Sequence, residues 1–132
     1  MIQFVKLYLL SAGLFLIIDL FWLVVVSRKM YQHFIGQLLG ETRLLPAILF
    51  YLLYVAGVTF FVLLPGVEKE SLAYIIGAGA LFGLVSYATY DLTNLATLKD
   101  WPVVMTVIDL AWGIFVTATT SGIVYWVNQH FF

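Results

Sequence analysis

Four long apolar runs dominate this sequence, and they limit the possible folds more than any other feature. They cover approximately residues 4–26, 44–64, 72–98 and 102–127. A helix needs about 20 consecutive apolar residues to cross the hydrocarbon core of a bilayer, so each run is long enough for one crossing. The runs lack the sustained alternation of barrel strands and are too long for them. They therefore predict a single all-α integral membrane domain over residues 1–132, with four transmembrane helices in one bundle.

Turn and capping signals separate the runs. Pro65-Gly66 follows the second run and is a strong turn signal, so we expect that helix to end at Leu64. Ser71 is a suitable N-cap for the third run, and Trp101-Pro102 begins the fourth. These signals favour short loops between the spans.

The composition leaves no room for a further soluble domain. Of the 132 residues, 64% are hydrophobic and 10% are charged, whereas soluble domains have about 25% charged residues. The net charge of −1 gives no basic footprint for nucleic acid. The chain has no cysteine, which excludes disulfides and thiolate metal sites. We expect no metal site and no nucleic-acid partner, and the sequence leaves any cofactor unknown.

The segment from Arg28 to Arg43, between the first two runs, has an amphipathic pattern. Its apolar residues recur at helical spacing and are Tyr31, Phe34, Ile35, Leu38 and Leu39. Such a stripe is typical of a helix in the membrane interface. We expect a short amphipathic interfacial helix between the first two transmembrane helices, and the alternative is a simple extension of the first span.

The distribution of lysine and arginine predicts the orientation. Loops one and three carry Arg28, Lys29, Arg43 and Lys99, whereas the opposite side carries Lys6 and Lys69. Cytoplasmic loops are enriched in these residues. We therefore expect loops one and three in the cytoplasm and both termini outside.

Three aspartates, Asp19, Asp91 and Asp109, lie inside the apolar runs. A charged side chain at the centre of a span costs a few kcal/mol even on the mildest scale. At a rise of 1.5 Å per residue, each aspartate lies roughly 10–13 Å from the same membrane boundary. The spacing therefore predicts three carboxylates in one layer of the bundle.

Polar neighbours accompany these acids. Tyr87 and Asn94 share a helix face with Asp91, and Tyr51 reaches the same depth from the second run. Arg43 lies one turn before the second span and is long enough to bend inward as a counter-charge. The expected ligand- or proton-binding residues are Asp19, Asp91, Asp109, Asn94, Tyr51, Tyr87 and Arg43, and no catalytic residue is assigned.

The motif Asp-Leu-x-Trp occurs twice, once in the first run and once in the last. It places Trp22 and Trp112 beside the acids as flanking aromatic residues. On the third run, Gly79 and Gly83 permit close approach of another helix, and packing inside the monomer is favoured over dimerisation.

Three functions fit these residues. The first is a site that binds or transports a small polar or cationic solute, with proton coupling as an option. The second is a membrane-embedded enzyme acting on a lipid or isoprenoid, with aspartates as general acid and base. The third is a structural or partner-binding module in which the acids link helices. An apolar cleft opening sideways would favour the enzyme, and a polar cavity open to water would favour the carrier.

The expected partners follow from the apolar runs and the buried acids. The lipid bilayer surrounds the helices, and the ligand is a small molecule, a cation or a lipid. Four helices are few for alternating access, so a homodimer is attractive for a carrier.

A long ordered string of residues resembles a known family. The matching segments are YDLTNLATLKDWP at 90–102, Asp109-x-x-Trp112-Gly113, Asp19-x-x-Trp22 and Arg43-x-x-Pro46. Together they resemble the bacterial membrane proteins grouped as domain of unknown function 2177, over essentially the whole chain. The resemblance implies a bacterial inner-membrane protein of four helices, and it implies no particular activity.

Overall fold

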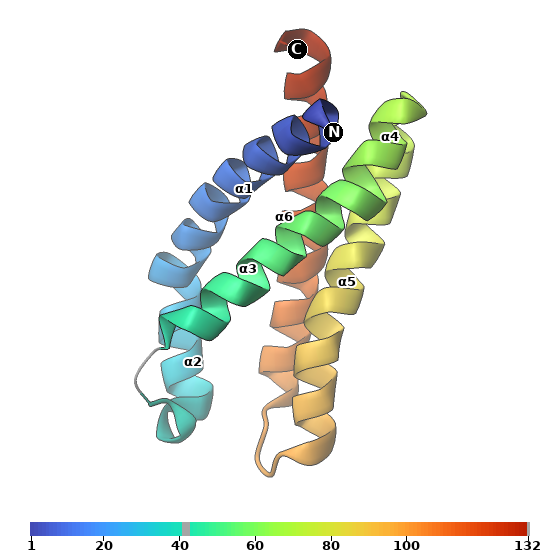
Figure 1. The fold of residues 1–132 in the computed structure, drawn as a ribbon. Coiled ribbons are helices and arrows are strands. Elements are labelled where there is room, and N and C mark those ends of the chain that lie inside the picture. The colour runs from blue at the N-terminus through green and yellow to red at the C-terminus, as the bar shows by residue number, and fades with distance from the viewer. Residues whose placement is uncertain (41–42, 132) are drawn as a thin grey trace.

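Four long helical stretches form an up-and-down bundle in the computed structural model, which describes residues 1–40 and 43–131 (Figure 1). The stretches are Ile2–Leu38, Leu44–Glu68, Leu72–Thr97 and Val103–Phe131, and each is long and apolar enough to cross a membrane. No strand occurs in these described ranges. The all-α fold with four membrane-spanning helices is therefore confirmed.

The first stretch continues without a break past the expected end of the span. It comprises α1 (Ile2–Trp22), a π-helical turn η1 (Leu23–Ser27), α2 (Arg28–Ile35) and a short 3-10 turn η2 (Gly36–Leu38). Its 37 residues correspond to about 55 Å of helix, whereas the hydrocarbon core is about 30 Å thick. A separate interfacial helix is not confirmed, because α2 is joined directly to α1.

The amphipathic stripe of α2 packs against the bundle. Ile35 is buried together with Trp101 and Met105, and Tyr31 and Phe34 pack beside them. The stripe therefore covers the start of α6 (Val103–Phe131) and the loop before it, which explains the helical pattern without placing α2 flat on a membrane surface.

The second stretch also continues past its expected end. It comprises α3 (Leu44–Val58), a π-helical turn η3 (Thr59–Leu63) and α4 (Leu64–Glu68). The helix runs through Pro65 and beyond the expected end at Leu64. Proline lacks the N–H that continues a helix, but it is tolerated in the first turn. Pro65 occupies the first turn of α4, directly after the π-helical turn, so the chain continues as helix.

The helices α5 (Leu72–Thr97) and α6 are the most closely packed pair. A Cβ atom at Gly83 would overlap the backbone carbonyl of Gly113 on α6, and one at Gly79 would lie 3.3 Å from the backbone of Thr117. Small residues let two helix backbones approach in this way. The Gly79 and Gly83 motif therefore serves packing inside the monomer, as expected.

The ends of the bundle agree with the expected loop arrangement. Figure 1 shows both termini and the α4–α5 turn at one end, and the α2 end and the α5–α6 loop at the other. Ser71 caps α5 by accepting a hydrogen bond of 3.0 Å from the backbone N–H of Tyr74. Loops one and three therefore lie at the same end of the molecule.

The surface of the bundle is far more apolar than that of a soluble protein. Large apolar side chains such as Leu53, Phe60 and Val107 are more than half exposed. Polar side chains are buried together with an apolar core that includes Leu7, Ile75 and Val116. The buried polar residues are Ser11, Ser27, Thr59, Asp91, Thr106, Asp109, Thr117, Thr120, Ser121 and Asn128. Because extensive exposed apolar surface is unusual for a soluble monomer, this distribution is typical of a protein surrounded by lipid.

Candidate functional site

Asp91 on α5 and Asp109 on α6 form a buried carboxyl pair. Their side chains are 0% and 2% exposed and lie within hydrogen-bonding reach of each other. Within the described residues, neither oxygen of Asp91 has a partner that meets full hydrogen-bond geometry, and this includes Asp109. An ionised carboxylate only accepts hydrogen bonds, so two carboxyl groups can bond only when one carries a proton. The geometry therefore suits a shared proton.

Tyr31 closes the pair from the side of α2. Its hydroxyl donates a hydrogen bond of 2.9 Å to Oδ2 of Asp109. One turn before Asp109, Thr106 accepts a hydrogen bond of 3.0 Å from the indole N–H of Trp101. In the sequence, Tyr31 belongs to an apolar stripe, and its contact with Asp109 was not predicted. The available signal was the one hydroxyl in that stripe, directly beyond the end of the first span.

Asp19 lies apart from this pair, half-buried on α1. The indole N–H of Trp112 lies near it, as do the hydroxyls of Tyr51, Tyr54 and Tyr87. Trp112 Nε1 nevertheless has no partner that meets full hydrogen-bond geometry. Trp112 thus approaches Asp19 but leaves the hydrogen-bonding capacity of its carboxyl group unsatisfied.

Trp22 and Trp112 stack directly on each other. Their ring centroids are 4.2 Å apart and the planes differ by 8°, an arrangement that contributes about 0.5–1.5 kcal/mol beyond area burial. The two Asp-Leu-x-Trp motifs therefore meet through their tryptophans, one from α1 and one from α6.

Tyr87 lies between the two acidic groups. It is near enough to interact electrostatically with both Asp19 and Asp109. Its side chain packs so closely on α6 that a Cβ at Gly113 would lie 2.5 Å from the ring. Within the described ranges, no three acidic or histidine side chains gather in a metal-binding group. The acids are therefore arranged as a pair and a single carboxylate, with Tyr87 between them.

Of the remaining expected residues, Tyr51 lies near Asp19 and lines the same cleft. Tyr51 donates a hydrogen bond from its hydroxyl to the backbone carbonyl of Ala12 on α1. Asn94 is half-buried one turn after Asp91. Arg43 is exposed at the N-cap of α3, and its role as a counter-charge stays a prediction.

A cleft of about 590 Å³ separates α1 from α3 beside Tyr87 of α5. Ligand pockets commonly have about 300–1,000 Å³. A second hollow of about 220 Å³ shares Phe50 and Tyr87 with it. The cleft is lined by Phe15, Leu16, Asp19, Leu23, Leu44, Ala47, Ile48, Phe50, Tyr51, Leu52 and Tyr87.

The rim of this cleft is apolar. Leu16, Ile48 and Phe50 line it and are each about half exposed on the outer surface of the bundle. These residues belong to helices that are long and apolar enough to cross a membrane, so the opening lies on the apolar side of the bundle. Asp19 is the acidic residue in the lining. The cleft thus combines a lateral apolar opening with one carboxyl group.

A family comparison covers nearly all of these features. The model of the family described as "Predicted membrane protein (DUF2177)" matches residues 4–126, a range that includes all three aspartates and the complete lining of the cleft. No curated protein and no solved structure matches the chain. The extent of the family match and the four apolar helices confirm the resemblance seen in the sequence, and the chain belongs to the DUF2177 family of membrane proteins.

Proposed function

We propose that this protein binds a lipid-like amphiphile in the cleft between α1, α3 and α5, with the polar end of the amphiphile at Asp19. The observation that carries the proposal is an apolar cleft that opens toward lipid and contains a carboxyl group. The apolar walls accept a hydrocarbon chain, and the carboxyl group selects the polar end.

The free energy of an unpaired acid supports this arrangement. A carboxylate within the hydrocarbon region costs a few kcal/mol. No hydrogen bond of full geometry to Asp19 occurs in the described part of the chain, although Trp112 is near. A ligand amine or hydroxyl would supply the missing donor, and a hydrogen bond to a charged group contributes about 1.5–3 kcal/mol. This corresponds to roughly a 10- to 100-fold gain in affinity.

The unsatisfied carboxyl group of Asp19 also defines the chemical class of the ligand. A long-chain amine or alcohol places a donor at Asp19, whereas a fatty acid or phosphate places a second negative group there. Lateral access between α1 and α3 lets such a molecule enter from the bilayer. A carrier for a small hydrophilic solute is less well supported, because Tyr31 covers the Asp91 and Asp109 pair.

An enzyme acting on the same class of molecule is the second candidate. The position of Tyr87, beside the cleft and between Asp19 and the carboxyl pair, favours it. A phenol in this position can donate a proton to a ligand. The carboxyl pair can in turn serve as the proton source for the phenol. Chemical conversion of a bound long-chain alcohol or amine, followed by mass spectrometry, distinguishes an enzyme from a binding protein.

Binding of matched amphiphiles tests the proposal. The full chain in nanodiscs is titrated with fluorescent amine, alcohol and carboxylate probes of equal chain length, and protein-free nanodiscs provide the background. We expect the amine and the alcohol to bind roughly 10- to 100-fold more tightly than the carboxylate. In Asp19→Asn, which retains hydrogen bonding but cannot ionise, the preference for the amine falls at least about tenfold.

A pair of tryptophan substitutions controls for the site. Ala47→Trp fills the cleft, since Ala47 lines it, and we expect it to abolish binding of all three probes. Ala111→Trp adds the same side chain on the exposed face of α6 outside the cleft and leaves binding unchanged. Unaltered binding in both Asp19→Asn and Ala47→Trp would contradict the proposal.

The location and orientation are part of the same proposal. We propose a bacterial inner membrane as the location. We infer that loops one and three lie at the cytoplasmic face, because Arg28, Lys29 and Lys99 are exposed at that end. The chain has no native cysteine, so Gln37→Cys and Glu68→Cys can each report one face. An impermeant maleimide added to intact cells should label Glu68→Cys alone, and the reverse pattern would invert the orientation. A homodimer remains a prediction that cross-linking of the same variants can test.

A further inference from the structure

The second hollow, of about 220 Å³, lies between α3 and α5 beside the cleft at Asp19. Phe50 of α3 lines it on one side, and Ser86, Tyr87 and Tyr90 of α5 line it on the other. Three of these four side chains are aromatic, so the walls are mainly carbon. An apolar cavity of about 150 Å³ binds benzene. The hollow is therefore large enough for part of a hydrocarbon chain.

The hollow and the cleft meet at two residues. Phe50 and Tyr87 line both spaces, whereas Ser86 and Tyr90 line the hollow and not the cleft. Tyr87 is also near enough to Asp19 to interact with it electrostatically. A molecule whose polar end lies at Asp19 therefore has two apolar spaces within reach, and both use the Phe50 side chain as a wall.

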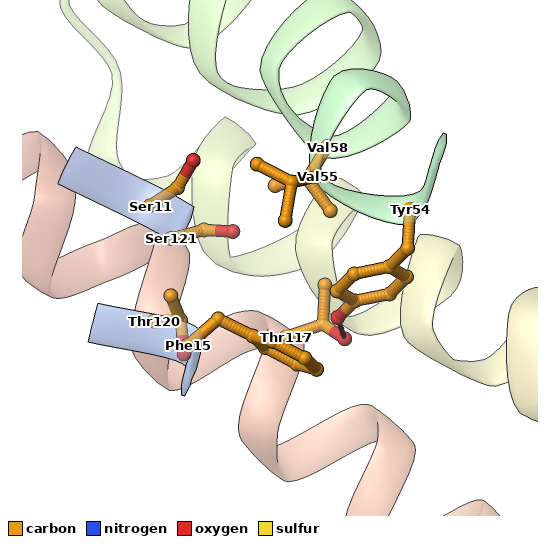
Figure 2. A pocket seen from close by; sticks show the side chains of 8 residues that line it. All are labelled: Ser11, Phe15, Tyr54, Val55, Val58, Thr117, Thr120 and Ser121. Atoms are coloured by element: carbon orange, nitrogen blue, oxygen red, sulfur yellow. Dashed lines mark hydrogen bonds between the residues drawn. The ribbon is translucent and has the colours of Figure 1, made fainter. Parts of the chain in front are cut away.

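The Phe50 side chain is held in place by Tyr54, one turn further along α3. The two ring centroids are 5.8 Å apart. Tyr54 is itself buried and packs on Phe15 of α1 at 4.6 Å, and Figure 2 shows its hydroxyl hydrogen-bonded to Thr117 of α6. Because Tyr54 is fixed by both α1 and α6, we expect Phe50 to keep its position between the hollow and the cleft.

We propose that the ligand is an amphiphile with two hydrocarbon branches, one in the cleft and one in the hollow lined by Ser86 and Tyr90. The proposal rests on the proposed function, because it takes the polar end of the ligand to lie at Asp19. A single chain fills one of the two spaces and leaves the other to chains of the bilayer. A second branch on the same molecule is held beside the hollow, so its binding becomes intramolecular.

The gain from the second branch comes from packing and from this linkage. The hollow and the bilayer interior are both apolar, so transfer from one to the other has little hydrophobic driving force. The branch contacts the rings of Phe50, Tyr87 and Tyr90 instead, and no separate lipid chain has to be ordered in the hollow. We therefore expect a preference of at least about fivefold for two branches over one, well below the largest gains that linkage gives.

Binding of a one-chain and a two-chain alcohol to the full chain in nanodiscs tests the proposal. Both probes carry one hydroxyl and the same fluorescent group, and affinities are expressed per mole fraction of probe in the bilayer, with protein-free nanodiscs as background. The two-chain alcohol should bind at least about fivefold more tightly. Equal affinities would overturn the two-branch proposal and leave the proposed function in place. Binding of neither alcohol would overturn both.

A tryptophan in the hollow locates the second branch. Ser86→Trp places an indole in the hollow and not in the cleft, so we expect it to abolish the preference for the two-chain alcohol. Thr89→Trp adds the same side chain at an exposed position of α5 and should retain the preference. An unchanged preference in Ser86→Trp would overturn the assignment of the branch to this hollow.

Photochemical labelling of the unmodified sequence gives a second measurement that does not depend on how a variant folds. A diazirine at the end of one chain of the two-chain alcohol should label residues 86–90 of α5, and an excess of the unlabelled two-chain alcohol should suppress this labelling. Labelling of other segments alone, detected by mass spectrometry of the digested protein, would overturn the proposal.

Discussion

The two acidic regions of this bundle differ in how tightly their helices pack. Asp91 and Asp109 lie between α5 and α6, where glycines bring the backbones together and Tyr31 covers the carboxyl groups. Asp19 lies where α1 and α3 diverge and leave a cleft of about 590 Å³. Close packing gives the pair protein partners, whereas separation leaves Asp19 accessible to a molecule from the bilayer. Similar carboxyl groups therefore suit different roles.

The largest effect on the region around Asp91 and Asp109 is expected when α5 is forced away from α6. Gly83→Leu places a side chain against the backbone carbonyl of Gly113, so we expect destabilisation of about 3 kcal/mol or more, at the upper end of overpacking effects. Thermal unfolding in detergent measures this effect. Gly77→Leu is the matched control, because a Cβ at Gly77 meets nothing within 4 Å, and a similar loss in both variants would contradict close packing at Gly83.

Removing the Tyr31 hydroxyl exposes the carboxyl pair without disturbing the interface between α5 and α6. Tyr31→Phe eliminates a hydrogen bond of 2.9 Å to a buried carboxyl, so we expect a loss of about 1.5–3 kcal/mol in unfolding free energy. The comparison variant is Tyr8→Phe, whose hydroxyl makes an exposed bond of 3.3 Å to the Leu52 carbonyl. The effect of Tyr31→Phe should exceed that of Tyr8→Phe clearly, and equal effects would remove Tyr31 from the site.

Asparagine substitutions at Asp91 and Asp19 distinguish the two acidic regions, and we expect them to change stability least. Asp91→Asn retains a side chain that can donate to Asp109, so the protein should fold with less than about 1 kcal/mol of change in unfolding free energy. It should nevertheless lose an infrared band of a protonated carboxyl group at neutral pH. Asp19→Asn should leave that band in place. Retention of the band in Asp91→Asn would exclude the shared proton.

The spans were predictable because lipid imposes a simple requirement on composition. A run of about 20 apolar residues is typical of a transmembrane helix. Aspartates within such a run almost always face the interior of the bundle or a cavity. The continuation past Pro65 was not predictable from the turn signal, because it depends on the π-helical turn that precedes α4. The continuous passage from α1 to α2 likewise depends on packing at Ile35 and Trp101.

Which of the aspartates face each other depends on how each helix is rotated about its axis. Counting residues from a membrane boundary gives only their depth. Counting residues placed Asp19, Asp91 and Asp109 in one layer but did not show which of them face each other. That is decided by the close contact of Gly83 with Gly113, which turns Asp91 toward Asp109. Tyr31 was not predicted as a site residue. Its aromatic ring fits an apolar stripe, and its hydroxyl fits a polar site equally well.

The stacked indoles of Trp22 and Trp112 give the protein an internal optical reporter. Rings this close and nearly parallel couple their electronic transitions, so the pair should contribute a characteristic near-ultraviolet circular dichroism signal. Trp112 also adjoins Asp19, whereas Trp126 is exposed near the end of α6. An amphiphile arriving at Asp19 would alter the pair directly. Occupancy of the cleft can thus be followed by the protein's own absorption, without attaching a dye.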